Sequence, residues 1–258
     1  MKTKIINDLE VEELSKKFTS SYPFHYIVID DFLDLNLAKS LKENFPKPDQ
    51  QTWWLYDNPL EKKLAFNKIE NLDESFSRFF SYVNSNEFLS LLTILTNVQK
   101  LKSDSNLHGG GLHLIKQGGK LDIHEDFNIH KGLGMLRKLN LILYLNDPWE
   151  ESWGGHLEIW NKDVTELCNK ILPKFNRAVI FRTDMNSNHG HPHPLTCPDD
   201  KYRMSLATYY YVEHSEIESI PYKSTSYKKL PGEDDGLDEL RELRKTGRLQ
   251  NLTNYNKK

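Results

Sequence analysis

Residues 111–146 read GLHLIKQGGKLDIHEDFNIHKGLGMLRKLNLILYLN, and this stretch decides the class of fold. Short runs of alternating or β-branched apolar residues are separated here by Gly, Asn and Asp, which is typical of antiparallel strands joined by turns. The runs predict strands at Gly111–Ile115, Lys120–His124 and Leu139–Leu145. This part of the chain is therefore expected to form an antiparallel β structure.

The same pattern continues as far as residue 212. It predicts further strands at His156–Trp160, Ala178–Arg182 and Arg203–Val212, with turns rich in glycine, asparagine or proline between several of them. A set of short strands preceded by helices suits a double-stranded β-helix, also called a jelly roll or cupin-like fold. The expected fold class is α+β, an all-β core with flanking helices.

Helices are expected before and after this core. A short strand at Tyr26–Ile29 precedes a helix that starts near Asp34, and the pattern over 73–98 is again helical. The tail over 234–249 has leucines at helical spacing amid charges, which predicts an amphipathic helix. Because no repeat or linker divides the chain, we expect one structural domain with N-terminal packing elements in 1–100, a catalytic core in 101–214 and an extension in 215–258.

Composition narrows the class of protein. The 258 residues include 34 Lys+Arg against 37 Asp+Glu, and the net charge of -3 gives no hint of nucleic acid as a partner. No apolar run approaches the roughly 18 residues of a transmembrane helix, and the N-terminus is polar, so no membrane association is expected. Cys168 and Cys197 are too few for a disulfide framework, which favours a soluble protein of the reducing cytoplasm.

Two histidines and one aspartate suggest a metal site. His124 and Asp126 are separated by one residue at the end of a predicted strand, so alternation points both side chains to the same side. A third ligand is available in the His-rich segment 189–193, which follows another predicted strand. Two imidazoles and one carboxylate form the facial triad that leaves open positions on non-haem Fe(II). Zinc accepts the same ligands, so the residues alone leave both metals open.

Arg203 points to a second ligand. It shares one side of a predicted strand with Ser205, and an arginine that points into a barrel is costly unless it pairs with an anion. The guanidinium fork suits a carboxylate, and the neighbouring hydroxyl supplies one more donor. An enzyme that binds a dicarboxylate cosubstrate needs such a group, whereas a zinc hydrolase does not. The alternative is a surface arginine on a sheet edge.

In order and spacing, these features resemble the prolyl-4-hydroxylase-like branch of the 2-oxoglutarate/Fe(II) oxygenases. The resemblance covers most of residues 24–212 and depends on several short motifs taken together. These are IDDFL at 29–33, GGKL at 118–121 before HED at 124–126, YLN at 144–146, GGHL at 154–157, FRTD at 181–184 five residues ahead of His189, and finally Arg203.

The resemblance implies a set of site residues. It implies that Fe(II) is held by His124, Asp126 and His189, and that 2-oxoglutarate is bound through its distal carboxylate by Arg203, with help from Tyr144, Ser205 and Asn140. The interval from His189 to Arg203 is longer than is usual in the family, so His191 and His193 remain alternatives as the distal ligand.

The resemblance also implies the reaction. O2 is used to hydroxylate an unactivated C–H bond while 2-oxoglutarate is decarboxylated to succinate and CO2, with ascorbate as a candidate reductant. Related halogenases lack the carboxylate ligand so that chloride can take its place, and Asp126 therefore implies hydroxylation. A non-catalytic or zinc-binding jelly-roll protein is the alternative.

The substrate is less well defined. A prolyl or other peptidyl side chain is favoured by the resemblance, and a free amino acid or small metabolite is the alternative. The segments 47–72, 127–138 and 147–154 are expected to be variable loops that decide the substrate, with Asn128, His130 and Arg137 as candidate contacts. His113 is expected either to line the pocket or to pack within the sheet. An unpaired edge strand or the tail could serve a homodimer.

Overall fold

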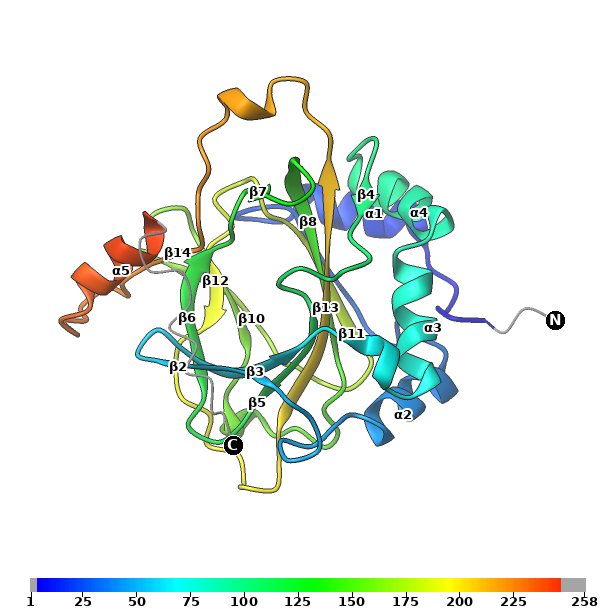
Figure 1. The fold of residues 1–258 in the computed structure, drawn as a ribbon, viewed down its shortest axis with the longest axis horizontal. Helices are drawn as coiled ribbons and strands as arrows, with labels where there is room; N and C mark the ends of the chain where they lie inside the picture. The colour runs from blue at the N-terminus through cyan, green and yellow to red at the C-terminus, as the bar shows by residue number, and fades with distance from the viewer. Residues whose placement is uncertain (1–3, 247–258) are drawn as a thin grey trace.

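Fourteen strands form one curled antiparallel sheet in the computed structural model, which describes residues 4–246. The main path runs β1-β11-β8-β13-β5-β3-β6-β12-β9-β10, and the sheet curls so that β6 and β12 lie across an interior from β8 and β13 (Figure 1). The strands are β1 (Tyr26–Ile29), β2 (Trp54–Asn58), β3 (Glu61–Phe66), β4 (Lys102–Ser103), β5 (Gly111–Ile115), β6 (Lys120–Glu125), β7 (Ile129–His130), β8 (Met135–Tyr144), β9 (Leu157–Trp160), β10 (Leu167–Ile171), β11 (Arg177–Arg182), β12 (His189–His191), β13 (Arg203–Val212) and β14 (Ser226–Tyr227).

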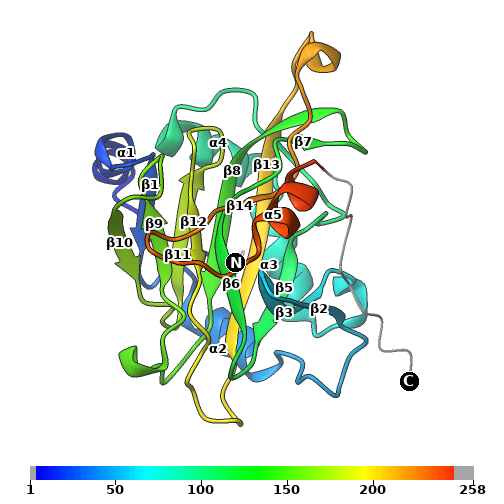
Figure 2. The same ribbon diagram turned by 90° about the vertical axis from the view of Figure 1, so that its left-hand side faces the viewer.

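Five α-helices accompany the sheet within residues 4–246. They are α1 (Val11–Ser20), α2 (Leu35–Glu43), α3 (Glu74–Val83), α4 (Asn86–Thr96) and α5 (Asp238–Lys245). The helices α1 to α4 lie on one side of the sheet, and both ribbon views place α5 and β14 on the other side (Figures 1 and 2). None of the helices in the described part is long and apolar enough to cross a membrane.

Local sequence explains where the helices begin. The Asp34 side chain accepts from the backbone N–H groups of Asn36 and Leu37, and Asp73 and Ser85 cap α3 and α4 in the same way. The helical stretch predicted over 73–98 is two helices because the Ser85 hydroxyl caps a new start. The predicted tail helix is shorter than expected, and residues 247–249 of that prediction lie outside the described residues.

Alternation along the central strands divides the apolar core from the interior of the barrel. Strand residues that pack with the helices form one buried cluster with, for example, Phe76 and Leu92. In β8 and β13 these are Leu139, Leu141, Leu143, Leu206 and Tyr210. The residues between them line an interior cavity, and they include Asn140, Ile142, Tyr144, Arg203, Ser205, Ala207 and Tyr209. Because successive side chains of a strand point to opposite faces, the same strands build both the core and the site.

The strands of the predicted core agree with the sequence pattern, two of them at both ends. Those at Gly111–Ile115 and Arg203–Val212 match, while β8 begins four residues earlier than predicted, at Met135. The sequence pattern missed the hairpin of β2 and β3, which lies inside a segment expected to be a loop. It also missed the three-residue strand β12.

Candidate active site

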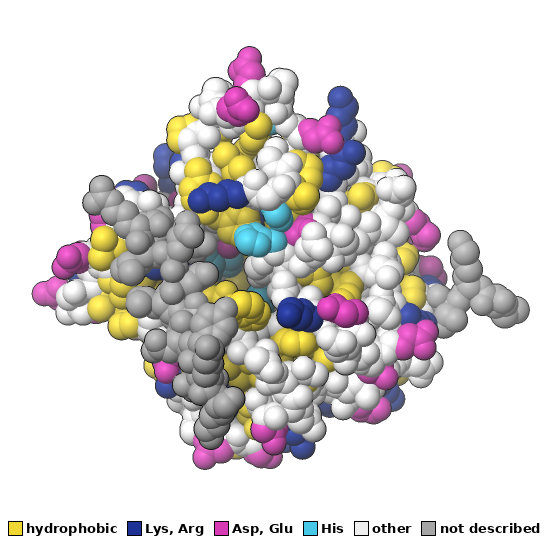
Figure 3. All heavy atoms as spheres, viewed as in Figure 1, with side chains coloured by type: hydrophobic (Ala, Val, Ile, Leu, Met, Phe, Trp, Pro, Cys, Tyr) yellow, Lys and Arg dark blue, Asp and Glu magenta, His cyan; other side chains and the backbone are white. Residues whose placement is uncertain are grey.

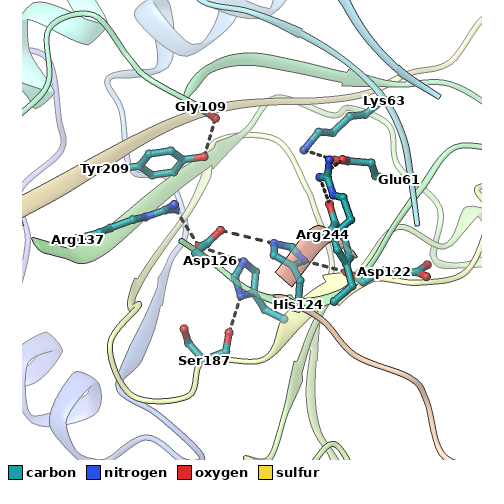
Figure 4. A network of polar contacts seen from close by, with 12 residues as sticks. Glu61, Lys63, Gly109, Asp122, His124, Asp126, Arg137, Ser187, Tyr209 and Arg244 are labelled. Atoms are coloured by element: carbon teal, nitrogen blue, oxygen red, sulfur yellow. Dashed lines mark hydrogen bonds and ion pairs between the residues drawn. The ribbon is translucent and has the colours of Figure 1, made fainter. Parts of the chain in front are cut away.

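His124, Asp126 and His189 come together in the interior cavity, and Figure 4 shows the first two of them. His124 lies near the end of β6, Asp126 follows that strand, and His189 is directly opposite His124 in the β6–β12 pairing. His124 Nε2 is 3.6 Å from Asp126 Oδ1, and His189 Nε2 is 3.7 Å from Asp126 Oδ2. The three candidate ligand atoms all lie within 4.8 Å of one another.

Backbone carbonyls fix both imidazole rings. His124 Nδ1 is 2.8 Å from the carbonyl oxygen of Asp122, and His189 Nδ1 is 2.8 Å from that of Ser187. A ring nitrogen facing a carbonyl must donate, so the proton of the neutral ring is on Nδ1 and the Nε2 lone pair faces the shared space. This arrangement of outer hydrogen bonds is typical of histidines that bind metals.

Arg137 controls the charge of the carboxylate. Its Nη2 donates to Asp126 Oδ2 at 2.8 Å, and its guanidinium lies 3.5 Å from the centre of the Tyr209 ring. Burial alone would raise the pKa of Asp126, but the Arg137 charge outweighs it and holds this pKa well below its usual range. Burial lowers the pKa of His189 to about 4. The cluster therefore offers a carboxylate and a neutral imidazole to a cation.

Arg203 is buried in the same cavity, with only 5% of its surface exposed. Its Nε donates to the carbonyl oxygen of Gly155 at 2.7 Å and its Nη2 to the Tyr144 hydroxyl at 3.2 Å. Among the described residues no carboxylate pairs with it, although a buried guanidinium ordinarily needs one. The alternative of a surface arginine is therefore wrong, and the buried guanidinium is suited to bind an anionic ligand.

Glycine is required beside this guanidinium. Gly155 has φ +71°, and a Cβ there would lie 2.9 Å from Cδ of Arg203 and 2.7 Å from Cδ2 of Leu195. The second glycine of the GGHL motif at 154–157 thus leaves room for the side chain of Arg203.

Unbonded polar atoms surround the space between Arg203 and the His–Asp–His cluster. Asn140 Oδ1 and both ring nitrogens of His191 are buried with no hydrogen-bond partner among the described residues. Ser205 lines the same cavity and is buried. Because buried polar groups are rarely left without partners, these atoms fit a polar ligand such as a dicarboxylate.

The cavity has a volume of about 640 Å³, and Figure 3 shows histidine side chains in a hollow on this face of the molecule. His113 lines it, which is one of the two expectations for this residue. His191 lines it too but lies outside the three-residue cluster. His193 lies instead in a separate shallow groove beside Glu158 and Trp160.

The candidate substrate contacts have different roles in the structure. Residues of 54–67 and of 127–137 line the cavity, but no residue of the expected segment 147–154 does so. Asn128 holds the C-terminal segment, since its amide donates to the carbonyl of Pro221 at 2.9 Å and accepts from the N–H of Lys223 at 2.7 Å. His130 lies 3.2 Å from an Asp104 carboxylate oxygen.

Several cavity residues were missed by the sequence analysis. On the β2–β3 hairpin, Tyr56 is directly opposite Lys63, and both line the cavity with Glu61. Arg244 reaches the cavity from α5. Alternation within 61–65 could have identified the hairpin residues, but no local signal in the tail indicates that Arg244 contributes to the site.

A comparison with protein families gives one match. The model of the 2OG-Fe(II) oxygenase superfamily matches residues 89–211, which include the His–Asp–His cluster and Arg203.

Solved structures with a similar fold include two prolyl hydroxylases and one protein solved with hygromycin B. The Pseudomonas putida prolyl-4-hydroxylase is 16% identical, with a TM-score of 0.55 and coverage of 78% of this chain and 100% of that one. The Trichoplax adhaerens prolyl hydroxylase, solved with a hypoxia inducible factor peptide fragment, is 17% identical, with a TM-score of 0.57 and coverage of 81% and 94%. HygX from Streptomyces hygroscopicus, solved with nickel, 2-oxoglutarate and hygromycin B, is 10% identical, with a TM-score of 0.52 and coverage of 86% and 98%.

At sequence identities of 10–17%, the similarity to these structures shows a shared fold. It confirms the predicted jelly roll with N-terminal packing helices.

Proposed function

We propose, from the premise that this chain belongs to the 2OG-Fe(II) oxygenase superfamily, that it hydroxylates an unactivated C–H bond at the cavity described above. The observation that carries the assignment to this cavity is the buried Arg203, which has no carboxylate partner in the described part of the chain and shares the cavity with the His–Asp–His cluster. When bound, Fe(II), 2-oxoglutarate and O2 supply the oxidising chemistry, in which 2-oxoglutarate is converted to succinate and CO2.

His124, Asp126 and His189 are the proposed iron ligands. Their Nε2 lone pairs and one carboxylate oxygen face a shared space, while Nδ1 of each ring is held by a backbone carbonyl. Arg137 occupies Asp126 Oδ2, which leaves Oδ1 as the oxygen for the metal. We choose His189 over His191 and His193 because it alone of the three belongs to the cluster.

Arg203 and Tyr144 are the proposed partners of the distal carboxylate of 2-oxoglutarate. The guanidinium is already oriented by Gly155, so its remaining N–H groups are free to form a fork with a carboxylate. Ser205 and Asn140 lie in the same cavity and supply further polar contacts. These residues bind and orient the cosubstrate, and the surrounding apolar walls exclude water from the reacting atoms.

One experiment tests this assignment. Under anaerobic conditions, Fe(II) and 2-oxoglutarate together should give a weak visible charge-transfer band, and His124→Ala should lose it. A zinc-binding protein without a cosubstrate would give no band and no affinity for 2-oxoglutarate. The absence of a band at saturating Fe(II) and 2-oxoglutarate in the folded wild-type protein would contradict the assignment.

The substrate is part of the proposal as well. A prolyl or other peptidyl side chain is supported by the peptide fragment bound in the Trichoplax adhaerens prolyl hydroxylase. A small molecule is the second candidate, because the volume of about 640 Å³ is typical of cavities that bind small ligands. Release of succinate in the presence of each candidate compound distinguishes them.

We further propose that the protein is located in the cytoplasm and forms a homodimer. Cys168 and Cys197 are both free, which is consistent with a reducing compartment. Light scattering of the purified protein tests the proposed homodimer.

A further inference from the structure

A cluster of charges forms one wall of the cavity, on β3 and α5, and β5 lies between β3 and the Arg203 strand β13. It consists of Glu61 and Lys63 from β3 and Arg244 from α5 (Figure 4). Glu61 is 2% exposed, and its two oxygens are divided between the two cations. Arg244 Nη2 contacts Oε1 at 2.7 Å, and Lys63 Nζ contacts Oε2 at 3.3 Å. Two cations share one carboxylate, so the cluster has a net positive charge.

Lys63 is the cation with unused bonding capacity. Arg244 contacts the Tyr227 hydroxyl as well as Glu61, whereas the Lys63 ammonium has Glu61 as its one carboxylate among the described residues and lies 4.9 Å from the centre of the Tyr56 ring. An ammonium has three donors, and only 16% of this side chain is exposed. When a substrate displaces water from the cavity, the remaining donors need an acceptor.

The other charges of the cavity do not supply that acceptor. Arg137 forms an ion pair with Asp126. Arg203 is the proposed partner of 2-oxoglutarate, whose two negative charges balance the two positive charges of Fe(II). Lys131 adds a further positive charge at the rim, with its ammonium 4.0 Å from the centre of the Tyr222 ring. Burial alone would lower the pKa of Lys63, but the Glu61 carboxylate outweighs it and holds this pKa above its usual value. The loaded site therefore keeps an excess of positive charge.

The neighbours of Lys63 describe the rest of the ligand. The cavity wall around it includes the rings of Trp54, Tyr56 and Tyr209, so an apolar or flat group would pack beside the ammonium. Figure 4 shows Lys63 beside Glu61 and Arg244, and Tyr209 beside Gly109 and Arg137. All of these residues line the cavity that also contains His124 and Asp126.

We propose that the substrate of this site carries a carboxylate, and that Lys63 binds it and so determines specificity. The inference rests on the proposed function, since the same cavity is taken to hold the metal and 2-oxoglutarate. The carboxylate could belong to a small organic acid or to an acidic side chain next to the hydroxylated residue of a peptide, and the experiment below has one arm for each.

The first arm uses two small probes of the same shape, 4-fluorobenzoate and 4-fluorobenzamide. Their binding to the whole protein loaded with Zn(II) and saturating 2-oxoglutarate is measured by fluorine NMR. Because 2-oxoglutarate occupies Arg203, the acid cannot bind there. We expect the acid to bind about tenfold more tightly than the amide, the effect of one charge-assisted contact. The second arm compares the peptides Gly-Pro-Glu-Gly and Gly-Pro-Gln-Gly in the same way, each with an N-terminal trifluoroacetyl cap that fluorine NMR detects.

Variants assign the preference to Lys63. Lys63→Gln should bring the ratio of the two affinities to about one, and Lys63→Arg should retain it, because both basic side chains can donate to a carboxylate. Lys62→Gln is the matched control and should leave the ratio unchanged, because Lys62 is the exposed neighbour of Lys63 on β3 and does not line the cavity. An unchanged affinity for 2-oxoglutarate shows that Lys63→Gln is correctly folded.

The outcomes separate this inference from the proposed function. A preference for the acid in the first arm identifies a small organic acid, and a preference for the Glu peptide alone identifies a peptidyl substrate. Equal binding of acid and amide in both arms, no binding at millimolar concentration, or an unchanged ratio in Lys63→Gln overturns the inference while 2-oxoglutarate still binds. If 2-oxoglutarate itself fails to bind, the proposed function fails first.

Discussion

Replacing Arg203 with methionine should separate ligand binding from folding. The guanidinium is 5% exposed and has two neutral partners, the Gly155 carbonyl and the Tyr144 hydroxyl. A fork to a carboxylate adds charge-assisted hydrogen bonds, so its loss should cost about 3 kcal/mol of binding free energy, or roughly 150-fold in the Kd of 2-oxoglutarate. Titration of the anaerobic Fe(II) protein with 2-oxoglutarate measures this change.

The stability of the ligand-free protein should respond differently. Breaking a buried ion pair costs about 3–5 kcal/mol, but Arg203 has no carboxylate partner among the described residues. The loss of its two hydrogen bonds is offset by removing a buried charge, so we expect the free energy of unfolding to fall by no more than about 1–2 kcal/mol. Urea denaturation of the metal-free protein measures it.

Tyr144→Phe is the control for this experiment. It removes one hydroxyl next to the guanidinium, and we expect the Kd of 2-oxoglutarate to rise only about fivefold, the effect of one hydrogen bond of about 1 kcal/mol. The reasoning would be refuted if Arg203→Met lost more than about 3 kcal/mol of stability while keeping the wild-type affinity for 2-oxoglutarate, because a structural role predicts that result.

Three further predictions concern the metal ligand, the pH dependence and the fold. Asp126→Gly should abolish hydroxylation, and unchanged substrate-dependent succinate release at matched Fe(II) would contradict its role. Burial, together with the charges of Lys63 and Arg203, lowers the pKa of His113 to about 3. Below pH ~6.5 the unfolded chain therefore binds a proton that the folded protein does not, and the free energy of unfolding decreases as the pH decreases. Between pH 7 and 5, His113→Gln should reduce this decrease by up to about 2 kcal/mol, as measured by urea unfolding. If the free energy of unfolding of the variant and of the wild type had the same dependence on pH, His113 would be excluded as the cause. Asn176→Ala should cost about 3 kcal/mol, because the buried amide exchanges two 2.9 Å hydrogen bonds with the backbone of Leu33; a loss below about 1 kcal/mol would show that water replaces them.

Much of the barrel follows from local sequence. Alternation in 139–144 places leucines on one face and Asn140, Ile142 and Tyr144 on the other, and the structure shows these faces in the core and the cavity. The same rule put His124 and Asp126 on one side of a strand end, and the order of motifs indicated the family. These features depend on residues close together in the chain.

Other parts of the site depended on distant pairings. Spacing from the FRTD motif favoured His189 but left His191 and His193 as alternatives. The pairing of β12 with β6 brings His189 opposite His124. Glu61 and Lys63 belong to 47–72, which was predicted to be a variable loop. Glu61 is buried and Lys63 is half-buried because β3 pairs with β5 and β6, and because Arg244 reaches Glu61 across 183 positions.

The sequence by itself therefore determined the strands, their two faces and the candidate iron ligands near the end of β6. Only the tertiary structure decided which histidine completes the cluster, that Arg203 has no carboxylate partner within residues 4–246, and that two cations share Glu61 on the cavity wall. The physical reason is that strand alternation is a local property of the backbone. Register and charge pairing depend instead on contacts between residues far apart in the chain.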